Sequence, residues 1–267
     1  MLKEKLLLGQ YYPADSPVHR LTAHCKILVT LLYMIALFVA DDWLGWAVMT
    51  AVGVGAVLLS RVPFKAIWRG MKIIIFFCVL TLLLNLFMYP GDTVLWTWRK
   101  LTLTAEGLSY GLAMALRLFM LVVFASLLTL TTTPIMLTDG MEKVLSPGRR
   151  IGIPAHEIAM MMSIALRFIP TILEEFDRIV LAQRARGADL SKGNVVQRLK
   201  AFVPLLVPLF VAAFRRAEDL AQAMEAKCYR GGEGRTRWKV VKWQKRDTVC
   251  LIFFLLLLAA AIVERVL

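Results

Sequence analysis

The sequence lacks the short motifs with which many enzymes hold a nucleotide, a metal ion or an acyl intermediate. No GxxxxGK[ST] phosphate loop occurs, so the chain itself is not expected to hydrolyse ATP. HExxH is absent, and the histidines and cysteines show no spacing typical of a metal site. GxSxG, a signature of many hydrolases, is missing as well. We therefore expect no catalytic residue, no metal site and no cofactor.

Cysteine and acidic residues are also scarce. The four cysteines form no CxxC pair and two of them lie in apolar runs, so we expect reduced thiols and no disulfide framework. Only 19 acidic residues oppose 32 lysines and arginines, which leaves a net charge of +13. In a soluble protein this charge would suggest nucleic acid binding. Here basic cytoplasmic loops of a membrane protein explain it better, and no nucleic-acid partner is expected.

Hydrophobic residues, by contrast, are abundant. They make up 59% of the chain, whereas a soluble domain averages about 45–50%. This composition predicts an integral membrane protein that lies in a lipid bilayer, with an all-α fold and about five transmembrane helices. The predicted spans are residues 26–40, 43–60, 73–89, 106–130 and 248–263.

Two of these spans carry small residues at every fourth position, a spacing typical of close helix packing in lipid. The packing partner could be a helix of the same chain or another membrane subunit. Arg117, in the fourth span, is costly in lipid, so it is expected to pair with a carboxylate, line a cavity or reach an interface. The two series of small residues are Ala47, Ala51 and Gly55, and Gly107, Gly111 and Ala115.

Between the fourth and fifth spans the pattern changes. Charges occur throughout residues 131–247, which predicts long amphipathic helices at about 155–186 and 195–227 with prolines inside them. Their apolar parts are short, so we expect them at or below the membrane interface. The chain therefore divides into an N-terminal membrane region, a region of amphipathic helices and a final membrane helix. The predicted boundaries are 1–130, 131–247 and 248–267.

The distribution of lysine and arginine predicts the orientation in the membrane. The cation-rich segments 61–72 and 131–247 fall on one side, and Asp41 and Asp42 fall on the other. The N-terminus and the amphipathic helices are therefore expected to be cytoplasmic, and the C-terminus to be outside. The basic segment GRTRWKVVKWQKR, residues 234–246, is typical of an interfacial anchor near anionic lipid.

The two long amphipathic helices end in the same pattern, in which a small residue, a long cation and a small residue follow one another. A cation is stable beside the last carbonyls of a helix, and the small neighbours leave room for a partner backbone. Arginine offers a rigid fork of donors to a carboxylate, while lysine offers a point charge. The pattern predicts two partner-binding tips, although ordinary helix ends with solvated cations remain the alternative. The tips are Ala185, Arg186 and Gly187, and Ala226, Lys227 and Cys228.

Two other functions need to be weighed. A membrane-embedded enzyme could use Arg117 and Arg167, but the spans contain no cluster of carboxylates or histidines. A channel or stand-alone secondary carrier would need a polar path through the spans, and Asn85 and Arg117 are nearly the only candidates. Both remain alternatives to a scaffold that binds partners.

Three segments together resemble the transmembrane T component of energy-coupling factor (ECF) transporters, which import vitamins and transition metals across the prokaryotic cell membrane. The resemblance extends from near the start of the chain to about residue 237, and the second segment is the most specific. The segments are GQYYPADSPVHRLTAHCKILVTLL, SIALRFIPTILEEFDRIVLAQRARGAD and AMEAKCYRGGEGRTR.

The resemblance implies a scaffold that joins two ABC-type ATPase subunits to a membrane-embedded substrate-binding S component. In this family, paired Ala-Arg-Gly motifs lie at the tips of crossing cytoplasmic coupling helices, and each arginine meets acidic residues in a groove of one ATPase. The first motif is intact here. In the second, Lys227 replaces arginine and Cys228 replaces glycine, so the charge remains but bidentate pairing does not.

Overall fold

The computed structural model describes residues 11–88, 94–98, 101–152, 154–187, 194–231 and 242–266, and most of them are helical. This confirms the predicted all-α membrane fold. The helices are α2 (Ala23–Val39), α3 (Trp43–Ser60), α4 (Phe64–Met88), α5 (Ala105–Thr131), α6 (Pro134–Leu145), the 3-10 helix η1 (Ser146–Ile151), α7 (Ala155–Ala185), α8 (Val195–Ala226) and α9 (Lys245–Val266).

Five of the described helices are long and apolar enough to cross a membrane, namely α3, α4, α5, α7 and α9. The number of candidate spans agrees with the predicted number of about five, but the helices are not all the same ones. α2, expected as the first span, has 17 residues, which is fewer than any of these five helices has. α7, expected at the interface, has an apolar stretch as long as a span. The segment between α4 and α5 also contains a small antiparallel hairpin of β1 (Val94–Trp98) and β2 (Leu101–Thr104).

The chain divides into two compact units. We call the first the bundle unit; it comprises Leu8–Val144 and Val240–Leu267 and contains α2 to α6, the hairpin and α9. The second is the crossed-helix unit, which comprises Met1–Leu7 and Leu145–Lys239 and contains η1, α7 and α8. The predicted domain boundaries remain predictions.

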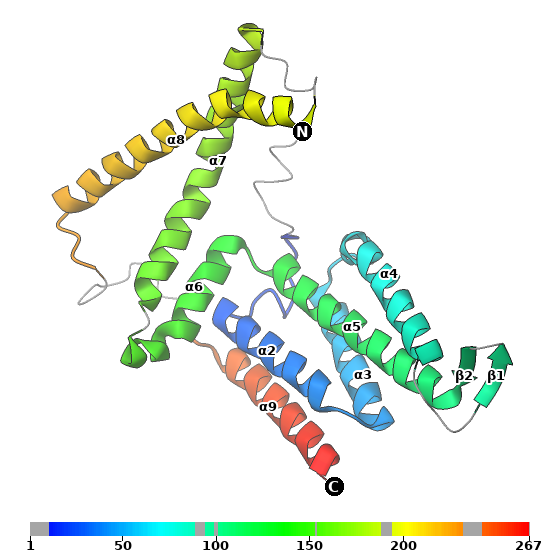
Figure 1. Ribbon diagram of the computed structural model, residues 1–267. Helices are drawn as coiled ribbons and strands as arrows, with labels where there is room; N and C mark the ends of the chain where they lie inside the picture. The colour runs from blue at the N-terminus through cyan, green and yellow to red at the C-terminus, as the bar shows by residue number, and fades with distance from the viewer. Residues whose placement is uncertain are drawn as a thin grey trace. The chain divides into compact units, whose positions relative to one another are not determined.

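An aromatic cluster forms the centre of the bundle unit. Tyr33 of α2 is fully buried and stacks on Phe124 of α5, with 3.9 Å between ring centroids. Phe254 of α9 contacts both rings edge to face. The Tyr33 hydroxyl donates a 3.0 Å hydrogen bond to the carbonyl of Met49 in α3, so its polar group is satisfied. One side chain thus connects four helices. Figure 1 shows α2 beside α3, α5 and α9.

α4 and α5 pack closely along the second series of small residues. A Cβ added to Gly111 would lie 3.2 Å from the carbonyl oxygen of Leu82, and one added to Gly107 would lie 3.0 Å from that of Asn85. The prediction of close helix packing is therefore confirmed for this series, with the partner in the same chain. The first series differs, because Ala47 and Ala51 are exposed and a Cβ on Gly55 would meet nothing within 4 Å.

Buried polar contacts hold together the end of the bundle at which α2 and α9 begin. Asp247 is fully buried; its carboxylate accepts hydrogen bonds of 2.9 Å from the backbone N–H groups of Thr22 and Gln244. The ammonium group of Lys26 donates a 2.8 Å hydrogen bond to the carbonyl of Thr131 at the end of α5. These contacts fix the starts of α2 and α9 against the end of α5, because a buried charge is stable only when its hydrogen bonds are made.

The N-terminal stretch lies against the same end. Tyr12 donates from its backbone N–H to the carbonyl of Leu130 at 2.9 Å. His19 Nε2 donates to the carbonyl of Tyr12 at 3.0 Å, so Nδ1 accepts from the Ser16 hydroxyl at 2.7 Å. Partial burial lowers the pKa of His19 below its usual value, and the nearby charge of Lys26 adds to this effect.

Candidate partner-docking tips

The two helices that carry the predicted tips cross in the crossed-helix unit, and their C-terminal ends lie well apart (Figure 1). An ion pair connects them, with 3.6 Å between Arg216 Nη2 on α8 and Glu175 Oε2 on α7. Both helices continue through their internal prolines, which are Pro170, Pro204 and Pro208. The crossing therefore presents two separate helix ends from one pair of helices in contact.

α7 ends at the first predicted tip. Arg186 is the C-cap residue, and its backbone N–H donates to the carbonyl of Ala182 at 3.2 Å. Gly187 follows with φ of +86°, and its N–H returns to the carbonyl of Arg184 at 3.0 Å. Glycine is suited to this left-handed position because it has no Cβ. Apart from its chain neighbours, no described residue comes within 4 Å of where a Cβ on Gly187 would be.

α8 ends in the same way. Ala226 is its last residue, and Cys228 adopts the left-handed conformation with φ of +54°. Cys228 donates from its N–H to the carbonyl of Glu225 at 2.8 Å, and Tyr229 donates to that of Met224 at 3.0 Å. This pair of bonds defines a Schellman motif. The replacement of glycine by cysteine has therefore kept the backbone geometry, although a residue with a Cβ is strained there by about 1–2 kcal/mol.

Arg186 and Lys227 consequently occupy the same position in two similar helix ends. Each stands between the last helical alanine and a left-handed residue. Within the described part of the chain, neither side chain has an ion-pair partner, and both are exposed. All six predicted tip residues are exposed in the same way. The arrangement offers two cations, each beside helix carbonyls and small neighbours, to an acidic partner.

The structure also adds a contact that the sequence did not indicate. Glu175 of α7 pairs with Arg216 of α8. Arg167 is exposed. Helical spacing alone could not have identified the Glu175–Arg216 pair, because it depends on where α8 crosses α7. Residues 188–193 and 232–241, which include Asp189 and Trp238 from the sequence motifs, lie outside the described residues.

Metal-binding side chains do not gather in the described part of the chain. Among those residues, no group of three or more histidines, cysteines, aspartates or glutamates could hold a metal ion. The four cysteines, all of which are described, are free thiols.

Comparison with known proteins gives a consistent result. A family model described as "CbiQ: Cobalt transport protein" matches residues 14–238. A protein named "Energy-coupling factor transporter transmembrane protein EcfT" from Thermosediminibacter oceani is 52% identical over 261 residues, covering 98% of each chain. A protein of the same name from Clostridium kluyveri is 48% identical over 267 residues, covering 100% of this chain and 98% of its own.

Proposed function

Because this chain belongs to the family of transmembrane components of energy-coupling factor transporters, we propose that it is the subunit through which such a transporter couples ATP hydrolysis to import. In this proposal two ABC-type ATPase subunits dock on the tips of α7 and α8, and a membrane-embedded S component binds the cargo. One observation carries the proposal. Arg186 and Lys227 occupy the same position, directly before the left-handed residue, at the C-terminal ends of two similar helices.

The two tips share the same features, so they suit two partner subunits of the same kind. Each tip offers a cation, an alanine before it and a residue in the left-handed conformation after it. An ATPase groove with acidic residues would complement the cation, and the small neighbours would let the groove walls approach the helix end. Since α7 and α8 diverge beyond their crossing, the two grooves would belong to separate subunits. Arg186 would make the stronger contact because its guanidinium can bind a carboxylate with two hydrogen bonds.

In this proposal the chain is a scaffold and not an enzyme. ATP hydrolysis would take place in the partner subunits, and the S component would select a vitamin or a metal ion. The tips would face the cytoplasm together with the N-terminus, and the C-terminus would lie outside, as the distribution of cations indicates. Closure of the two ATPases would then move the tips, and the crossing of α7 and α8 would transmit the motion.

Co-purification tests this proposal. The full chain with an affinity tag, expressed with its genomic neighbours and extracted in mild detergent, should bring ATPase subunits and a small membrane protein with it. Vesicles that contain this complex should accumulate cargo only when ATP is supplied. A chain that purifies alone and transports cargo without ATP would identify a secondary carrier instead.

A further inference from the structure

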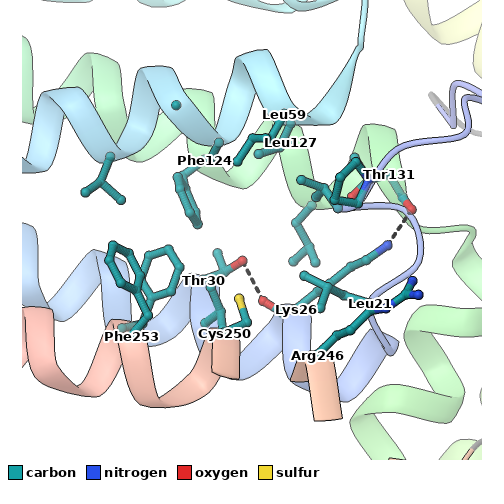
Figure 2. A pocket seen from close by; sticks show the side chains of 18 of the residues that line it. Leu21, Lys26, Thr30, Leu59, Phe124, Leu127, Thr131, Arg246, Cys250 and Phe253 are labelled. Carbon is teal, nitrogen blue, oxygen red and sulfur yellow. Dashed lines mark hydrogen bonds between the residues drawn. The ribbon is translucent and has the colours of Figure 1, made fainter. Parts of the chain in front are cut away.

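A cavity of about 720 Å³ lies in the bundle unit, between α2, α3, α5 and α9. It is at the end of the bundle where α2 and α9 begin and α3 and α5 end, close to Lys26 and Thr131. The volume falls within the range of about 300–1,000 Å³ that is usual for small-molecule sites. Figure 2 shows the side chains that line it.

Most of the wall of this cavity is apolar. Phe124 and Leu127 of α5 and Phe253 of α9 contribute large side chains, while Gly55 and Ala56 of α3 leave space. A Cβ on Gly55 would meet nothing within 4 Å, so the cavity continues to the backbone of α3. An apolar space of this kind suits a hydrocarbon chain, because the chain can make close van der Waals contacts with the side chains that line it.

One side of the cavity is basic. The lining includes Lys26, Lys245 and Arg246 and no acidic residue. In Figure 2 Lys26 and Arg246 lie together on one side, and Phe253 lies on the other. The Lys26 ammonium is almost completely buried, and its hydrogen bonds within the described part of the chain go to neutral oxygens, the nearest at 2.8 Å on Thr131.

Two acidic residues near this end bind other groups and do not line the cavity. Asp247 follows Arg246 in the chain, but it does not line the cavity, and backbone N–H groups occupy both of its carboxylate oxygens. Asp15 pairs with Arg20 at 2.7 Å. Lys245 and Arg246 are exposed. They are therefore available to an anion that lies at the mouth of the cavity.

We infer that this cavity binds one anionic phospholipid, with an acyl chain along the apolar wall and the phosphate beside Lys245 and Arg246. Charge complementarity favours this occupant, since basic pockets between membrane helices attract anionic head groups. Arginine can also donate two hydrogen bonds to one phosphate. The lipid would fill the space between α3 and α9 and hold the four helix ends together. The inference requires only that the bundle unit lies in a membrane and does not depend on the ATPase partners.

Photocrosslinking of the full chain in nanodiscs tests the inference. The probes are phosphatidylglycerol and phosphatidylcholine that carry the same diazirine acyl chain, each added at an equal mole fraction to phosphatidylcholine discs. Phosphatidylglycerol should label peptides of α3, α5 and α9 around the cavity more strongly than phosphatidylcholine does. Equal labelling by both probes would overturn the inference, because it would mean that the cavity takes acyl chains without regard to the head group.

Two kinds of variant separate the contributions of the basic side and the apolar wall. Lys245→Gln and Arg246→Gln should each reduce cavity labelling by phosphatidylglycerol about fivefold, since a cation near an anionic lipid contributes about 1 kcal/mol. Both residues are exposed, so neither substitution should unfold the bundle.

Gly55→Phe should fill the cavity and abolish labelling at these peptides. Gly70→Phe is its matched control, because a Cβ there also meets nothing within 4 Å and Gly70 does not line the cavity. If the charge variants retained full labelling, or if Gly55→Phe and Gly70→Phe behaved alike, the proposed lipid site would be wrong.

Discussion

Arg117 of α5 donates a 2.9 Å hydrogen bond from Nη2 to the carbonyl oxygen of Ala40, the C-cap residue of α2. The same nitrogen lies 3.8 Å from Asp41 Oδ1, and the guanidinium stands 5.5 Å from the centre of the Phe38 ring. The sequence left open whether this arginine pairs, lines a cavity or reaches an interface. The structure shows that it pairs, and that it neutralises the negative end of α2.

Replacement of Arg117 by Met should therefore destabilise the bundle. The substitution removes the charged donor from the carbonyl of Ala40, which keeps the 2.7 Å hydrogen bond from Trp46 Nε1. A hydrogen bond to a charged group contributes about 1.5–3 kcal/mol. Arg265→Gln is the matched control, because Arg265 pairs with the same Asp41 at 3.3 Å but is 57% exposed. An exposed pair contributes at most about 1 kcal/mol. Thermal unfolding in detergent measures both, and equal midpoints for the two variants would contradict the assigned role of Arg117.

Much of the fold follows from the sequence because the membrane imposes a simple pattern. Long apolar runs predicted α3, α4, α5 and α9, since only such runs form stable spans. Other features depend on tertiary contacts. The contact of Arg117 with Ala40 is one example, because the two residues lie 77 positions apart in the chain. Spacing in sequence carries no information on such contacts.

The close contact between α4 and α5 gives a second prediction. Gly111→Leu should disrupt the bundle, since even a Cβ at this position would lie 3.2 Å from a backbone oxygen that cannot move away easily. Leu112→Phe should be tolerated, because Leu112 is 60% exposed. Membrane yield and unfolding temperature in detergent distinguish the two. If both variants unfold at the same temperature, the glycine is not needed for close packing.

The partly buried imidazole of His19 predicts a pH dependence. Its pKa is lower in the folded chain than in the unfolded chain, mainly because of burial. The unfolded chain therefore takes up the proton first as the pH falls, and the folded state loses stability below about pH 6.5. Unfolding temperatures between pH 7.5 and about 5 should show this loss. His19→Asn removes the titrating group and should flatten that part of the profile; an unchanged slope would assign the effect to other residues.

Cysteine labelling tests the predicted orientation. In a cysteine-free background, Asp42→Cys should react with a membrane-impermeant maleimide added from outside, and Lys65→Cys should not. Both positions are exposed in the bundle unit, so the contrast reports the side of the membrane and not burial. Lys65→Cys should react once the membrane is permeabilised. The opposite pattern would place the N-terminus and the tips outside the cell.

The tips show what the sequence could and could not establish. The pattern of small residues and cations identified both helix ends, and the structure places Arg186 and Lys227 at the same cap position. The sequence could not indicate that Cys228 would keep the left-handed turn in place of glycine, because this conformation is uncommon for a residue with a Cβ.

Charge reversal at the tips tests the proposed docking most directly. Arg186→Glu should dissociate the ATPase subunits or uncouple them from transport, because removal of one member of a buried ion pair typically costs about 3–5 kcal/mol. Lys227→Glu should have a smaller effect, since a lysine makes a weaker contact with a carboxylate than an arginine does. Lys227→Arg should be tolerated and should tighten binding, because an arginine at the second tip could also donate two hydrogen bonds to one carboxylate.

Arg167→Glu serves as the control for these variants, because it reverses an exposed charge on α7 away from the tip. If the cations at the tips were merely solvated, charge reversal there would change binding by about 1 kcal/mol or less, as expected for an exposed charge. The measurements are pull-down of the ATPase subunits and ATP-dependent uptake in vesicles. Wild-type assembly and uptake in both Arg186→Glu and the double variant Arg186→Glu/Lys227→Glu would show that these residues are ordinary helix caps and that the ATPases bind elsewhere.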